Sequence, residues 1–277
     1  MIQLSTLDYL VLAGFLVLMI AVVWYSMRNK EEDTADYFLA GRNVGWLVIG
    51  ASIFASNIGS EHLVGLSGSG AASGMALAHW ELQSRIILLL GWLFVPFYWS
   101  SKVYTMPEFL ERRFNSQSRT FLSVISLISY VLTKVAVTVY AGGVAFKAIL
   151  GIESIWGIDF FWISAVGLVV ITGIYTVLGG MKAIMWTSVL QTPILIIGSV
   201  VIVVVGLDKV GGWAEVERIN GANMHLMRAA TDADFPWPGI IFGSFIIGFW
   251  YWCTDQYIVQ RVLSAKGIQA ARRGVHG

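Results

Sequence analysis

Three polar side chains interrupt an apolar stretch near the start of the chain. Asn57, Glu61 and His62 lie within residues 51–74 (ASIFASNIGSEHLVGLSGSGAASG), a segment that is otherwise apolar or small and rich in glycine. An ionised side chain at the bilayer centre costs roughly 2.5–3.5 kcal/mol, and glycine costs roughly 1 kcal/mol relative to alanine inside a helix. A helix that served only as an anchor would carry neither. The pattern therefore predicts a helix that breaks at mid-membrane, where freed carbonyls and polar side chains line a binding cavity.

The chemistry available at such a break is the binding of a cation and a polar solute. If the helix unwinds over residues 56–60, the carbonyl oxygens of Ala55 and Ile58 are free to coordinate a small hard cation such as sodium. The alternative is that the glycines only allow close packing between helices. The glycines alone favour neither the helix break nor close packing over the other. Glu61 and His62 in the same turn favour the cavity.

A second polar group lies on the next apolar segment, where Glu81, Ser84 and Arg85 share one face of a helix. One interpretation is structural: Glu81 and Arg85 have the i,i+4 spacing of an ion pair, which would neutralise both charges. The other is that Glu81 accepts hydrogen bonds from solute hydroxyl groups while Arg85 orients it. Both interpretations remain open at this point, and the functional one is favoured by the aromatic residues described next.

An aromatic trio lies inside the last apolar segment. Trp250, Tyr251 and Trp252 resemble an aromatic belt at the headgroup level, but the segment continues beyond them, which places them nearer the membrane centre. Aromatic faces beside hydroxyl-binding groups suit the C–H faces of a sugar ring. Asp255 follows on the same helical face as Tyr251. Lys134 is an isolated cation in the fourth apolar segment, and we expect it to pair with a carboxylate.

The elements that position these residues are transmembrane helices. The chain has 277 residues, of which 57% are hydrophobic and 13% charged, and its mean hydropathy is +0.72, so the bilayer is its expected solvent. A net charge of +1 argues against nucleic acid as a partner, and the single cysteine excludes a disulfide within the chain. The predicted class is all-α and integral to the membrane, a single transmembrane domain over 1–277. Segments of about 20 apolar residues predict seven spans, at about 7–26, 44–68, 75–99, 120–149, 159–178, 184–206 and 237–260.

The distribution of Lys and Arg predicts the orientation of the spans. The segments 27–43, 101–119, 179–183 and 261–277 together hold twelve of these residues, and the segment 207–236 on the opposite side holds three. Because positive charge is retained on the cytoplasmic side, we expect the N-terminus outside and the C-terminus inside. An odd number of spans agrees with this. Only the second and seventh spans combine glycines with polar or aromatic clusters, so we expect these two to be the discontinuous helices.

Several runs resemble the sodium/solute symporter family, and its sodium/glucose cotransporter branch in particular. The resemblance covers the chain from about residue 8 and is carried by DYFLAGR (36–42), GASIFASNIGSEHLVGLSGSG (50–70), GWLFVPFY (91–98), TMPEFLERRF (105–114), YTVLGGMKAIMWTSVLQT (175–192) and WYWCTDQYIVQRVLSAK (250–266). It implies a fold of two inverted five-helix repeats preceded by an extra helix. In this chain 7–26 would be the extra helix, 44–206 the first repeat, and 237–260 the first helix of the second repeat.

The same resemblance implies roles for individual residues. Sodium would be held partly by the carbonyls of Ala55 and Ile58, and Tyr251 would stack over the solute as an inner gate steadied by Asn57. No cofactor is implied other than sodium as the coupling ion. The residues that it assigns to the solute are His62, Glu81, Ser84, Tyr251, Trp252, Asn57 and Tyr140, the last as a weaker cavity position.

The sequence departs from the family at two points. Family members often carry an aspartate where this chain has Ser188, which affects any additional cation contact there. The sequence also ends just after the first helix of the second repeat, so we expect the C-terminal half to be a missing partner.

The predicted function is sodium-coupled symport of a small neutral sugar or polyol across the plasma membrane. The alternatives are a symporter for another solute (an inositol, an amino acid or a carboxylate) and a transport-incompetent fragment or sensor. An enzyme is not expected, because no nucleophile, base and orienting group occur together.

Overall fold

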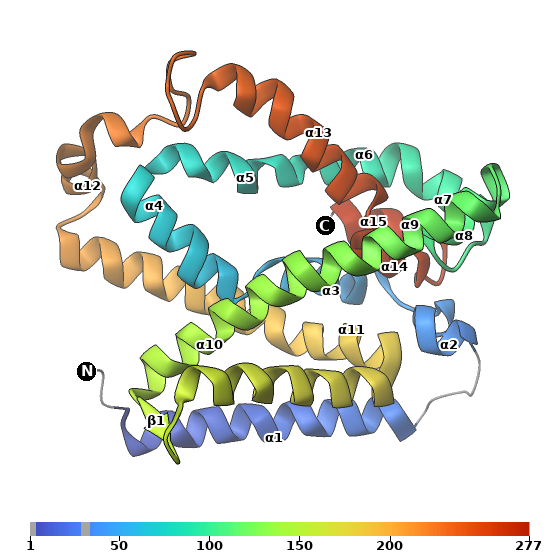
Figure 1. The fold of residues 1–277 in the computed structure, drawn as a ribbon, viewed down its shortest axis with the longest axis horizontal. Helices are drawn as coiled ribbons and strands as arrows, with labels where there is room; N and C mark the ends of the chain where they lie inside the picture. Colours follow the sequence, from blue (N-terminus) through green and yellow to red (C-terminus); the bar gives the residue numbers. More distant parts are fainter. Residues whose placement is uncertain (1–3, 29–33, 277) are drawn as a thin grey trace.

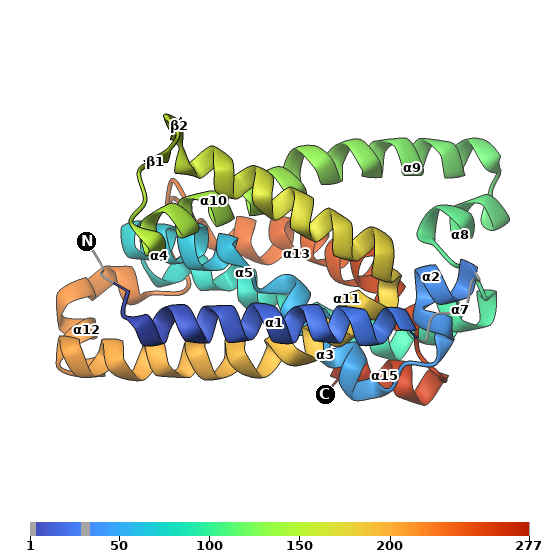
Figure 2. The ribbon, with the colours of Figure 1, turned by 90° about the horizontal axis from the view of Figure 1, so that it is seen from below.

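The computed structural model describes residues 4–28 and 34–276, and these are almost entirely helical (Figure 1). The first part of the chain forms α1 (Thr6–Arg28), which packs along α11 (Phe160–Val210) (Figure 2). Four helical stretches are individually long and apolar enough to cross a membrane, at 6–28, 75–101, 116–150 and 160–210. The helix pair 46–57 and 62–73 meets the same test as one bent span. The predicted fold class is therefore confirmed.

α11 contains two of the predicted spans. Its 51 residues would extend about 76 Å at 1.5 Å per residue, more than twice the hydrocarbon thickness. Its backbone leaves the helical conformation at Gly180 (φ 59°, ψ −158°), between the predicted spans 159–178 and 184–206. A Cβ atom at this position would lie 2.8 Å from the carbonyl oxygen of Tyr37, so only glycine fits the bend without strain.

Both spans predicted to be discontinuous are broken. The second consists of α3 (Trp46–Asn57), then η2 (His62–Leu66) and α4 (Ser67–Ser73), with a bend of 51° between the two parts. The seventh runs through η8 (Gly239–Gly243), α13 (Ser244–Phe249) and η9 (Trp250–Thr254), and resumes as α14 (Gln256–Leu263). Asp255 separates the two parts with an extended backbone (φ −68°, ψ 130°).

The remaining elements complete these spans and connect them. The third span contains η3 (Met75–Ala78), α5 (His79–Leu82), η4 (Gln83–Ile86), α6 (Ile87–Leu89), η5 (Leu90–Phe94) and α7 (Val95–Ser101). The fourth contains α9 (Ser116–Ser129), η6 (Tyr130–Val135) and α10 (Ala136–Leu150). The connections contain α2 (Thr34–Leu39), η1 (Ala40–Arg42), α8 (Met106–Arg113), the hairpin of β1 (Ser154–Ile155) and β2 (Ile158–Asp159), α12 (Trp213–Asn220) and η7 (Gly221–Met224), and α15 (Ile268–His276) follows the seventh span.

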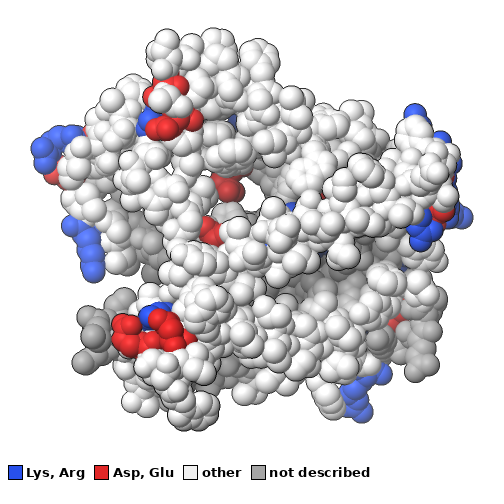
Figure 3. All heavy atoms as spheres, viewed as in Figure 1, with Lys and Arg blue, Asp and Glu red and all other residues white. Residues whose placement is uncertain are grey.

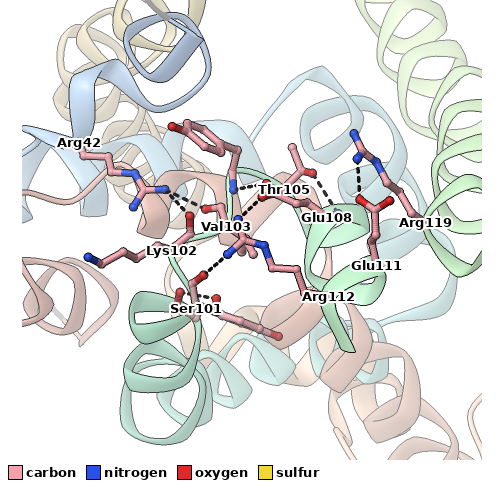
Figure 4. Close-up of polar contacts among 11 residues, drawn as sticks. Arg42, Ser101, Lys102, Val103, Thr105, Glu108, Glu111, Arg112 and Arg119 are labelled. Carbon is pink, nitrogen blue, oxygen red and sulfur yellow. Dashed lines mark hydrogen bonds and ion pairs between the residues drawn. The ribbon is translucent and has the colours of Figure 1, made fainter. Parts of the chain in front are cut away.

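α8 is the short helix that follows Thr105 and begins beside Pro107. Thr105 caps its N-terminus by accepting a hydrogen bond from the backbone N–H of Glu108 at 3.3 Å. The Glu108 carboxylate in turn accepts from the backbone N–H of Tyr104 at 2.7 Å. Arg42 and Arg112 donate to carbonyl oxygens of the turn that precedes α8, as Figure 4 shows. This end of the molecule is therefore held by hydrogen bonds from basic side chains.

The buried core lies where α3, α14 and α15 meet. α15 packs directly on α3, and a Cβ atom at Gly274 would lie 2.9 Å from the carbonyl oxygen of Trp46. Arg261 of α14 is buried and donates to the hydroxyl groups of Ser52 and Ser56, at 3.1 and 2.6 Å. Elsewhere most large apolar side chains are exposed, and Figure 3 shows Lys and Arg at the two ends of a largely uncharged face. This distribution fits a chain whose middle lies in lipid.

Candidate functional site

The break in the second span opens on a cavity of about 1170 Å³. α3 ends at Asn57, and Ile58 has an extended backbone (φ −113°, ψ 108°). Ala55 lies in the last turn of α3, where carbonyl oxygens lack the partners that a continuing helix would supply. The break falls inside the predicted range 56–60. Asn57, Glu61 and His62 all line the cavity, so the sequence correctly placed these three side chains together.

His62 and Glu81 join the second and third spans at the cavity wall. His62 Nε2 lies 3.3 Å from Glu81 Oε1, and His62 Nδ1 lies 3.9 Å from Glu61 Oε1. Arg85 does not pair with Glu81 in the part of the chain that the structure describes; it donates through Nε to the carbonyl of Leu82 at 2.9 Å. The structural interpretation of a Glu81–Arg85 pair is therefore wrong. Both glutamates belong to the lining, and Figure 3 shows acidic groups at an opening in the middle of the face.

The seventh span supplies the aromatic wall. Tyr251 and Trp252 line the cavity, with their ring centroids 5.2 Å apart and their planes perpendicular. The Tyr251 hydroxyl donates to Asn57 Oδ1 at 2.5 Å, which is the contact expected from the resemblance. The Tyr257 hydroxyl donates to the carbonyl of Ser56 at 2.6 Å. The two broken helices are thus linked to each other at their breaks.

Two residues assigned to the solute lie outside the cavity lining. Ser84 is half-buried but is not part of the lining, whereas its neighbour Gln83 is. Tyr140 is 61% exposed and packs edge-on against Phe161, with centroids 5.6 Å apart. Both assignments stay predictions, and neither is supported by the lining of this cavity.

A buried ion pair beside the cavity was only partly predicted. Lys134 Nζ lies 2.5 Å from Asp255 Oδ2, and the Tyr130 hydroxyl donates to the same carboxylate. The ammonium group also lies 4.7 Å from the ring centre of Tyr251 and 4.4 Å from that of Tyr257. The expectation that Lys134 pairs with a carboxylate is confirmed. Its partner Asp255 could also have been identified from the sequence, because it is an acidic residue inside an apolar segment.

Comparison with known proteins identifies the family. The profile described as "Sodium:solute symporter family" matches residues 37–276. The chain belongs to this family. It is 38% identical to the sodium/myo-inositol cotransporter of Canis lupus familiaris over 97% of its own length and 41% of the relative's, and 39% identical to sodium/glucose cotransporter 1 of Oryctolagus cuniculus over 94% and 42%. It therefore spans less than half the length of these relatives.

A solved structure with the same fold is that of a sodium-coupled sialic acid symporter in a substrate-bound, outward-open state. The TM-score is 0.84 at 24% identity, and the match covers 99% of this chain and 56% of that one. The chain thus has the inverted-repeat transporter fold of this neighbour, of which it covers 56%. Multi-pass membrane insertion follows from the family and from the apolar helices.

Proposed function

We propose that the chain forms the first part of a sodium-coupled symporter for a small, neutral, polyhydroxylated solute. The observation that carries this proposal is the joining of three spans around one cavity: the His62–Glu81 contact, the Tyr251–Asn57 hydrogen bond and the helix break lie on its wall. Carboxylate acceptors next to an aromatic face suit a ring that bears several hydroxyl groups. Relatives named for glucose and for myo-inositol both carry such solutes.

The charges of the cavity favour a neutral solute over an anionic one. Glu61 and Glu81 line it, while the lysine that also lines it, Lys134, is already paired with Asp255. Arg85 is exposed and is not part of the lining. A carboxylate solute would therefore meet two acidic groups without a free cation opposite them among the residues that the structure describes.

The helix break supplies part of a sodium site. The carbonyl oxygens of Ala55 and Ile58 are hard ligands of the kind that hard cations prefer, and they lie at the end of α3 and in the break that follows it. Two oxygens do not complete the coordination of such an ion. We expect the other ligands to come from helices of the second repeat, and we expect residues 1–277 alone not to accumulate solute against its gradient. The proposed location is the plasma membrane.

The proposal is tested by Glu81→Gln in a transporter that contains the second repeat. Hydrogen bonds to charged groups contribute roughly 1.5–3 kcal/mol, so the kcat/KM of sodium-dependent glucose or myo-inositol uptake should fall roughly ten- to hundredfold, with the amount of protein at the surface unchanged. Glu217→Gln on the exposed helix α12 is the matched control and should keep wild-type uptake. Normal uptake by Glu81→Gln at normal surface level would reject Glu81 as a solute contact, and absence of any sodium-dependent uptake by the wild type would reject the proposed function.

A further inference from the structure

Gln83 is held against the seventh span by local 3₁₀ winding. Residues Gln83–Ile86 form η4, a 3₁₀ segment, in which side chains three residues apart eclipse one another. Gln83 and Ile86 therefore form one stripe, and it faces Gly248 of α13. A Cβ atom at Gly248 would lie 2.8 Å from Gln83 Oε1 and 2.7 Å from Ile86 Cδ1. The absence of a side chain at Gly248 leaves the space that Gln83 occupies.

The amide of Gln83 has hydrogen-bonding capacity that the described residues do not use. Its Nε2 atom is buried and has no hydrogen-bond partner within residues 4–28 and 34–276. Buried polar atoms are nearly always paired, and one left unpaired is costly. Gln83 lines the same cavity as Glu81 and Tyr251. A solute that enters this cavity can therefore accept the hydrogen bond that Gln83 Nε2 is able to donate.

The groups next to Gln83 determine which hydrogen-bonding group of a solute could bind there. Glu61 also has a buried carboxylate oxygen in the cavity wall, Oε2, that is unpaired within the same described residues, and Glu81 is the acceptor that contacts His62. The wall therefore presents carboxylate acceptors together with the amide donor of Gln83. A hydroxyl group can donate to the first and accept from the second, because its oxygen does both.

We propose that Gln83 is a specificity-determining residue whose side-chain amide donates a hydrogen bond to one hydroxyl oxygen of the solute. The inference rests on the proposed function, because it assumes a polyhydroxylated solute in this cavity. It assigns to Gln83 the contact on the third span that the resemblance had assigned to Ser84.

The test compares solutes and variants in the intact transporter. Sodium-dependent uptake is measured for D-glucose, myo-inositol and the monodeoxy forms of whichever of the two is carried. The variants are Gln83→Met, which has nearly the same shape but no donor, and Gln83→Glu, which keeps the shape and the acceptor. Gln191→Met is the matched control, since Gln191 contacts Met19 of α1 and lies outside the cavity lining.

One deoxy solute should single out Gln83. Loss of one neutral hydrogen bond should reduce the kcat/KM of the wild type roughly two- to tenfold for the solute that lacks the contacted hydroxyl. Gln83→Met should show no such penalty for this solute while keeping the penalties for the other deoxy forms, and Gln191→Met should show the wild-type pattern. Gln83→Glu should keep a penalty for this solute, because its carboxylate can accept from the same hydroxyl group. Wild-type penalties for every deoxy form in folded Gln83→Met would overturn the inference alone. A wild type that takes up neither parent solute would overturn the proposed function and this inference together.

Discussion

Replacing Lys134 with methionine tests the buried ion pair beside the cavity. Asp255 is 2% exposed, and its carboxylate accepts from Lys134, from the hydroxyl of Tyr130 and from the backbone N–H of Tyr257. Removing one partner of a buried ion pair costs about 3–5 kcal/mol, because the other charge stays buried without compensation. Asp255 would retain two hydrogen bonds, so we expect Lys134→Met to lower the free energy of unfolding by about 3 kcal/mol, the lower end of that range.

The chain offers a matched control for this change. Lys147 Nζ lies 2.7 Å from Asp159, whose carboxylate also caps a helix, but that carboxylate is 49% exposed. An exposed ion pair is screened by water and contributes little, so Lys147→Met should lower the free energy of unfolding much less than Lys134→Met. The double variant Lys134→Met with Asp255→Leu should recover part of the lost stability, because no buried charge remains.

The assay is reversible unfolding of the purified chain in mixed micelles, followed by tryptophan fluorescence. Equal losses of unfolding free energy in Lys134→Met and Lys147→Met would refute the reasoning. The reasoning would also be refuted if the double variant lost as much unfolding free energy as the two single variants together. Such additivity would mean that Lys134 and Asp255 do not stabilise one another.

Three further predictions concern other parts of the chain. Gly180→Ala should destabilise the chain by about 1–3 kcal/mol because of its positive φ and the carbonyl oxygen 2.8 Å from the new Cβ; an unchanged unfolding midpoint would contradict this. Hydrogen bonds from backbone N–H groups of its own loop, chiefly that of Phe235, lower the pKa of Asp232. The ionised carboxylate therefore stabilises the loop above about pH 4, and this stabilisation is lost as the pH falls through the lowered pKa. Proteolysis of the loop should accelerate at that low pH in the wild type and show no such pH dependence in Asp232→Asn. In a Cys253→Ser background, an impermeant thiol reagent added outside intact cells should label Ser5→Cys and not Arg272→Cys, and the opposite result would reverse the predicted topology.

The position of the break in the second span, and the discontinuity of the seventh, could be predicted from the sequence because the composition of these segments is unusual for a membrane. Asn57 and His62 would be costly in a continuous membrane helix, and a glycine-rich break that opens on a cavity removes this cost. The pairing of Lys134 follows from the cost of an isolated charge. The side-chain directions of Ser84 and Tyr140 could not be obtained in this way. The shared face of Glu81, Ser84 and Arg85 assumes 3.6 residues per turn, whereas η4 has 3₁₀ winding at Ser84. The assignment of Tyr140 came from the resemblance alone, and η6, a π-helical segment of six residues, precedes it. Each local change of winding rotates the residues after it, and no residue type in these segments indicates the change.

The links between the two broken helices also bear on how the protein is made. The Tyr251–Asn57 and Arg261–Ser52 hydrogen bonds and the packing of α15 on α3 all join late residues to earlier ones. During synthesis the earlier helices are already present when the seventh span leaves the ribosome. That span can therefore dock on helices that are already present, and the buried carboxylate of Asp255 at its break finds its partners Lys134 and Tyr130 there. The earlier helices thus serve as a template for the folding of the seventh span.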